Sequence, residues 1–287
     1  MRGVILFFLL LFTACSNKFF SSTGNYKRVA LVIGNQNYKL KGDRLRNPIN
    51  DSVSIGEMLH KVGYKVIYKK DLDKYGLEEA LEALRKEIVP NETIVFIYYA
   101  GHSIIREKDS KTTHLQLVDN KKVFYSINKI LEKLKEFHAK HNILAIDSCQ
   151  NYKGNYIDNN KQEQHRLRAS NFKLIEAEAE KQNVIFYTSK TKDLNQFPSS
   201  TLISHATETN YGAAEQSSHD KDHSPYARCL INYIPRDDLT VEYMFIGVRR
   251  CVVDDTNGRQ MSFKDDNLIE TFTVPIIKGS SSIGIGY

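Results

Sequence analysis

Two short apolar runs constrain the fold most, because each has the length and residue types of a buried β-strand. Ile94–Tyr99 and Ile143–Ile146 are continuous apolar runs with β-branched and aromatic residues, a pattern typical of parallel strands covered on both faces. Between them, apolar residues recur at the spacing of one helix face: Ile127, Ile130, Leu131, Leu134 and Phe137. This order of strand, helix and strand predicts an α/β fold with a mostly parallel sheet.

A histidine and a cysteine follow these two strands. His102 lies in Tyr-Tyr-Ala-Gly-His-Ser after the first strand, and Cys149 lies in Asp-Ser-Cys-Gln after the second. Ligands of open α/β sheets bind beyond the carboxyl ends of the strands, so we expect both residues at one edge of the sheet. A thiolate is a nucleophile, and an imidazole can take up its proton and later protonate a leaving amine. The pair therefore indicates acyl-transfer chemistry.

The alternative interpretation is that Cys149 is a small core residue and His102 a hydrogen-bonded loop histidine. The shared sheet edge and the flanking residues favour the catalytic interpretation. The two residues are also 47 positions apart, close to the roughly 50 positions between the histidine and the cysteine of caspases.

Five ordered motifs resemble the caspase-like cysteine peptidases (peptidase C14 type), specifically the metacaspase and bacterial caspase-homologue branch. The resemblance covers about residues 27–274. Its motifs are Arg28–Asn35, Asn50–Ser52, Tyr99–His102, Asp147–Cys149 and His223–Tyr226, followed by Thr240–Gln260 as a late helix and a Gly-Arg-Gln turn. The resemblance implies a three-layer α/β sandwich, with a mostly parallel central sheet and helices on both faces.

The resemblance also implies the roles of particular residues. Cys149 would be the nucleophile and His102 the general acid and base, and the backbone N–H groups of Ser103 and Cys149 would form the oxyanion hole. Asp51 and Asp147 would line the pocket that selects arginine or lysine, since a partly buried carboxylate pair needs a cation. On its own, Asp51 is equally well explained as an acidic residue in the first turn of a helix. The expected function is a cysteine endopeptidase acting on proteins or peptides.

Two single residues and one three-residue stretch depart from the usual pattern of the relatives. Ser103 replaces a common glycine, Ala100 replaces a frequent pocket serine, and Gln150–Tyr152 replaces a usual His-Ser-Gly. Ser103 and the altered stretch after Cys149 leave open a second interpretation, a catalytically impaired pseudo-peptidase that acts as a binding module on a membrane surface.

The N-terminus has the pattern of a bacterial lipoprotein leader. Arg2 precedes the apolar run Val4–Phe12, which is too short to span a bilayer as a helix. Phe-Thr-Ala before Cys15 resembles a lipoprotein cleavage box. We therefore expect a signal peptide at 1–14, a lipidated Cys15 and tether at 15–27, the peptidase domain at 28–274 and a tail at 275–287. The expected location is the bacterial cell envelope, with the protein anchored in a membrane and facing the periplasm or the outside.

The net charge, the remaining histidines and the polar stretches do not predict a further function. The net charge of +6 is spread along the chain, which favours solvated surface over nucleic-acid binding. His219 and His223 flank Asp-Lys-Asp, but four-residue spacing aligns metal ligands only on a helix and this region is expected to be a loop. No metal or cofactor is expected, although calcium activates some metacaspases. Residues 151–170 and 190–222 are predicted to be long polar loops.

The two remaining cysteines lie in helix-like patterns. Cys229 and Cys251 are each surrounded by apolar residues at helical spacing. The two could pair, but we expect two buried free thiols.

Overall fold

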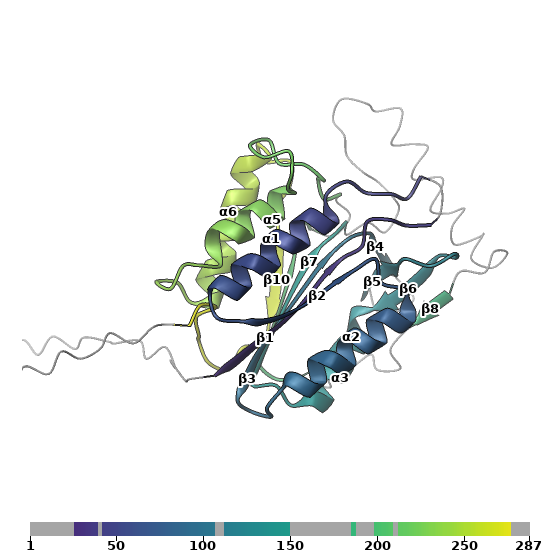
Figure 1. Ribbon diagram of the computed structural model, residues 1–287. Coiled ribbons are helices and arrows are strands. Elements are labelled where there is room, and N and C mark those ends of the chain that lie inside the picture. The colour runs from purple at the N-terminus through teal and green to yellow at the C-terminus, as the bar shows by residue number, and fades with distance from the viewer. Residues whose placement is uncertain are drawn as a thin grey trace, which may run out of the picture.

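The computed structural model describes residues 26–39, 42–106, 112–149, 185–187, 198–208 and 212–276. Within these ranges the chain forms a central six-stranded sheet, with a smaller four-stranded sheet at one end (Figure 1). The central sheet has the order β10-β9-β7-β3-β1-β2 and consists of β1 (Lys27–Gly34), β2 (Lys65–Lys70), β3 (Thr93–Ala100), β7 (His141–Asp147), β9 (Thr201–His205) and β10 (Phe263–Asp266). The smaller sheet has the order β4-β5-β6-β8 and consists of β4 (Ser103–Arg106), β5 (Thr112–Leu117), β6 (Val123–Ser126) and β8 (Ile185–Tyr187).

The central sheet is parallel apart from β10, which runs antiparallel to β9. One face is covered by α1 (Pro48–Lys61), α5 (Pro225–Tyr233) and α6 (Val241–Asp255), and the other by α2 (Lys74–Glu87) and α3 (Ile127–Phe137) (Figure 1). The predicted three-layer α/β architecture is therefore confirmed.

The alternation of side chains along each strand divides the core into two halves. Ala30 and Val32 of β1 pack with α1, α5 and α6, while Val29 and Leu31 pack with α2 and α3. Because apolar side chains leave β1 on both faces, the strand is buried as a continuous apolar run, as expected of a parallel strand.

Two expectations are wrong. The polar stretch 190–222 contains β9, which lies between β7 and β10 and is nearly completely buried. Its five residues, Thr-Leu-Ile-Ser-His, include three that are polar, so its strand character comes from its neighbours in the sheet. Cys229 and Cys251 form a disulfide between α5 and α6, with their Cα atoms 5.8 Å apart. The packing of the two helices brings these cysteines together, whereas the apolar spacing within each helix does not show how the helices pack.

Several expectations lie outside the described residues. They are the signal peptide at 1–14, Cys15 and most of its tether, the loop at 151–170 and most of the tail at 275–287. Within the described ranges, none of the helices has the length and apolar character needed to cross a membrane.

Candidate active site

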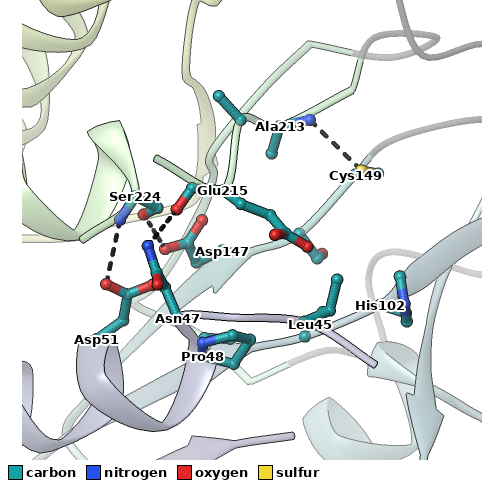
Figure 2. A pocket seen from close by; sticks show the side chains of 14 residues that line it. Leu45, Asn47, Pro48, Asp51, His102, Asp147, Cys149, Ala213, Glu215 and Ser224 are labelled. Carbon is teal, nitrogen blue, oxygen red and sulfur yellow. Dashed lines mark hydrogen bonds between the residues drawn. The ribbon is translucent and has the colours of Figure 1, made fainter. Parts of the chain in front are cut away.

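The site lies beyond the carboxyl ends of β3 and β7. These neighbouring parallel strands are in register at Ala100 and Asp147, so the residues that follow them meet at the same edge of the sheet. His102 and Cys149 both line one pocket of about 410 Å³ (Figure 2). The pocket is also lined by Leu45, Asn47, Pro48, Asp51, Ala100, Gly101, Asp147, Ser148, Ala213, Ala214, Glu215 and Ser224.

The orientation of His102 is fixed by two hydrogen bonds. Its backbone N–H donates to the hydroxyl of Tyr38 at 2.8 Å, and its ring Nε2 lies 2.8 Å from the carbonyl oxygen of Asp43. A carbonyl can only accept, so Nε2 carries the proton and Nδ1 of the neutral ring is left as an acceptor. Burial lowers the pKa of His102, which keeps the ring neutral near pH 7. The imidazole is therefore ready to accept a proton.

Cys149 is partly exposed, and its thiol is not part of a disulfide. Its Sγ accepts a hydrogen bond of 3.4 Å from the backbone N–H of Ala213 (Figure 2). The hydroxyl of Ser103 bonds the carbonyl oxygen of Cys149 and lies 2.7 Å from the hydroxyl of Ser148. Hydrogen bonds therefore connect Ser103, which follows His102, directly to Ser148 and Cys149.

The backbone N–H of Ser103 points away from β5. Ser103 opposes Leu115 in the antiparallel β4–β5 pair, and the neighbouring pair of His102 and Gln116 is joined by a hydrogen bond from Gln116 N–H. Hydrogen-bonded and non-hydrogen-bonded pairs alternate along antiparallel strands, so Ser103 belongs to a non-hydrogen-bonded pair. Since β4 is the outer strand of the four-stranded sheet, no second strand in the described part of the chain pairs with this amide. Ser103 is buried and does not itself line the pocket.

Asp51 and Asp147 meet at the opposite end of the same pocket from the nucleophile (Figure 2). Asp51 comes from the first turn of α1 and accepts a hydrogen bond of 3.1 Å from the backbone N–H of Ser224. Asp147 ends β7 and accepts hydrogen bonds from the hydroxyls of Ser224, at 2.6 Å, and Tyr98, at 2.8 Å. Ser224 is the N-cap of α5, and Pro225 follows it as the first residue of the helix.

Both carboxyl groups titrate above their usual range. Burial is the main cause for each, and for Asp51 the nearby Asp147 adds charge repulsion, so the pKa of both is raised. Two buried acids this close cannot both ionise without a cation. The pair therefore holds a proton near neutral pH that a bound cation would displace.

Glu215 adds a third carboxyl group to the pocket lining, and the sequence interpretation did not identify it. Partial burial raises the pKa of Glu215, against the opposing effect of Arg46. The Glu215 backbone is fixed by Asn47, whose side-chain amide donates to its carbonyl oxygen at 2.6 Å. Glu215 follows two small residues, Ala213 and Ala214, in a polar stretch, which is too weak a signal to identify it.

His219 and His223 are explained by other contacts. The Nδ1 of His223 bonds Asp220 at 2.6 Å and its Nε2 bonds Ser54 at 2.8 Å, while His219 pairs with Asp255. Among the described residues, no group of three or more His, Cys, Asp or Glu side chains has the arrangement of a metal site.

Comparison with known proteins identifies the family and the fold of the chain. Residues 27–273 match the caspase domain family over most of the chain. The chain belongs to the caspase domain family. This caspase-family chain is 26% identical over 128 residues to the human mucosa-associated lymphoid tissue lymphoma translocation protein 1, a match that covers 43% of the chain and 15% of the human protein.

A solved structure shows the same caspase fold. Caspase-1 from Spodoptera frugiperda superimposes with a TM-score of 0.61 at 10% sequence identity, covering 88% of this chain and 93% of the insect one. The family consists of cysteine peptidases, whose substrates are proteins.

Proposed function

We propose that this caspase-family chain is a cysteine endopeptidase that cleaves proteins or peptides after arginine or lysine. The observation that supports this most strongly is the single pocket with His102 and Cys149 at one end and the buried Asp51–Asp147 pair at the other. A substrate that places a basic side chain between the two aspartates would bring its following peptide bond toward the sulfur.

The reaction uses the neutral ring of His102 as the base that activates Cys149. The Cys149 thiol passes its proton to Nδ1 of His102, and the thiolate attacks the scissile carbonyl carbon. The backbone N–H groups of Ser103 and Cys149 stabilise the negative oxygen. His102 then gives its proton to the departing amine, and water releases the acyl group from the sulfur.

Three carboxyl groups support the basic specificity. Asp51, Asp147 and Glu215 all line the pocket, and a guanidinium or ammonium group makes charge-assisted hydrogen bonds with carboxylates. An aspartate side chain would meet repulsion here and would leave the buried pair without a cation.

The proposal is tested by incubating the purified wild-type protein with a peptide library in which the residue before the scissile bond is varied through all amino acids. We expect cleavage after arginine and lysine, and none with Cys149→Ala. Strong selection for aspartate would refute the specificity, and cleavage by Cys149→Ala at the wild-type rate would refute the nucleophile.

One contact favours a second candidate function, a pseudo-peptidase that binds peptides without cleaving them. The Ser103 hydroxyl holds the carbonyl oxygen of Cys149 at the place where relatives have glycine. Binding of basic peptides by the wild type, together with no turnover of any library member, would support this alternative.

We further propose that the chain is exported and lipidated at Cys15 in a bacterial envelope. The disulfide between Cys229 and Cys251 supports export, because disulfides persist in oxidising compartments outside the cytosol. Intact-mass analysis of the membrane fraction tests this, since lipidated protein begins at Cys15 with added acyl mass.

A further inference from the structure

The segment 212–215 supplies three residues that line the pocket, Ala213, Ala214 and Glu215, and contacts the nucleophile through Ala213. The N–H of Ala213 points to the sulfur of Cys149, whereas the next N–H, that of Ala214, donates to the side-chain oxygen of Gln260 at 2.9 Å. Gln260 does not line the pocket. The two successive N–H groups therefore point in different directions, that of Ala213 toward the nucleophile in the pocket and that of Ala214 toward Gln260 behind the pocket wall.

Gln260 joins this wall to the central sheet. Its side-chain nitrogen donates to the carbonyl oxygen of Ala206 at 2.8 Å. Ala206 directly follows β9, and its own N–H donates to Ile146 of β7, one residue before Asp147. One side-chain amide thus connects the pocket wall to the end of β7, which carries Asp147 and leads to the nucleophile.

The position of Gln260 is itself set by a turn. α6 ends at Asp255, and Asn257 and Gly258 have positive φ values of 50° and 74° that reverse the chain. The backbone N–H of Gln260 then donates to the hydroxyl of Thr256 at 3.0 Å. Gln260 is only 4% exposed, so water cannot readily replace its two bonds.

We propose that Gln260 is a positioning residue for substrate recognition: its carboxamide holds segment 212–215 so that the Ala213 peptide groups can pair with the backbone of a bound peptide. This inference rests on the proposed peptidase function. Gln260 reaches neither the nucleophile nor the acidic pair, so its loss should affect recognition of the peptide backbone more than the reactivity of the thiol.

The test variant is Gln260→Met, which keeps the length and volume of the side chain and removes both hydrogen bonds. Asn267→Ala is a matched control, because the Asn267 carboxamide likewise bridges backbone groups, Thr201 N–H at 2.7 Å and Pro198 carbonyl at 3.3 Å, at the opposite end of β9. Gln260→Glu, which retains an acceptor for the Ala214 N–H, serves as a second variant if Gln260→Met does not fold.

Two measurements are made on each protein. Hydrogen exchange reports whether the amides of 212–215 are held, and it does so without any activity. Hydrolysis is compared between a tetrapeptide amide ending in arginine and an acyl-arginine amide with no further residues, with the rate of Cys149 alkylation by iodoacetamide as the measure of thiol reactivity.

We expect Gln260→Met to speed exchange in 212–215 at least tenfold and to lower kcat/KM at least tenfold for the tetrapeptide, mainly through KM. The acyl-arginine substrate and the alkylation rate should change less than threefold, and Asn267→Ala should leave all these measurements within twofold of the wild type. Unchanged exchange, or an equal loss on both substrates, would overturn the inference. If the wild type cleaves neither substrate, the proposed function is refuted. Faster exchange in Gln260→Met would then still support the structural role of Gln260.

Discussion

Removing the Cys229–Cys251 disulfide should destabilise the domain by an amount that can be worked out from its loop. The bridge closes a loop with a sequence separation of 22 residues between α5 and α6. Loop-closure entropy for that length gives about 3 kcal/mol at 25 °C. In a domain of this size, 1 kcal/mol corresponds to roughly 2–4 °C in Tm, so reduction should lower Tm by roughly 6–12 °C.

The assay compares the thermal unfolding of oxidised and reduced protein. A Cys149→Ala background removes the pocket thiol, and mass spectrometry after alkylation verifies that both remaining cysteines of the domain are reduced. A Cys229→Ala/Cys251→Ala double variant should unfold near the reduced protein in Tm. A verified reduction that moves Tm by less than about 2 °C would refute the argument that the bridge constrains the unfolded chain.

Three further predictions concern the acidic pair and the anchor. Asp147→Asn should lower the preference for arginine over uncharged residues by on the order of tenfold or more, since a hydrogen bond to a charged group contributes about 1.5–3 kcal/mol. The measurement is the ratio of kcat/KM for two peptides that differ only in the residue before the scissile bond. A ratio equal to that of the wild type would contradict the prediction. The raised pKa of Asp51 means that the stability it contributes is complete below its unfolded pKa of about 4 and is lost as pH rises through its folded pKa. The urea concentration at the unfolding midpoint of the wild type should therefore fall between about pH 5 and 9, and Asp51→Asn should make this fall smaller. A fall as steep as that of the wild type would be incompatible with a buried, proton-holding pair. Cys15→Ser should release the protein from membranes, because stable anchoring needs more than one acyl chain; fractionation that finds the variant as membrane-bound as the wild type argues against lipidation.

The sequence predicts the strands that carry the site because their signals are local. The apolar runs Ile94–Tyr99 and Ile143–Ile146 lie within β3 and β7, and the apolar spacing between them corresponds to α3. The rule that parallel strands end at one edge then places His102 and Cys149 together, and both line one pocket in the structure.

Features that depend on packing between distant segments could not be predicted in this way. β9 is polar in three of its five positions and is a strand because β7 and β10 flank it. Glu215 reaches the pocket because Asn47 and Gln260 hold its segment from distant elements. The pairing of Cys229 with Cys251 depends on how α5 packs against α6, which apolar periodicity within each helix does not specify.

The most direct test of the central proposal is covalent labelling of Cys149 by a peptidyl-arginine chloromethylketone, read by mass spectrometry. We predict one adduct, located on Cys149 and absent from Cys149→Ala, with far slower labelling by the matching aspartate reagent. Asp147→Asn should be labelled more slowly by the arginine reagent, while its alkylation by iodoacetamide stays near the wild-type rate. No adduct on Cys149, or faster labelling by the aspartate reagent, would contradict the proposal of a cysteine endopeptidase with an acidic specificity pocket.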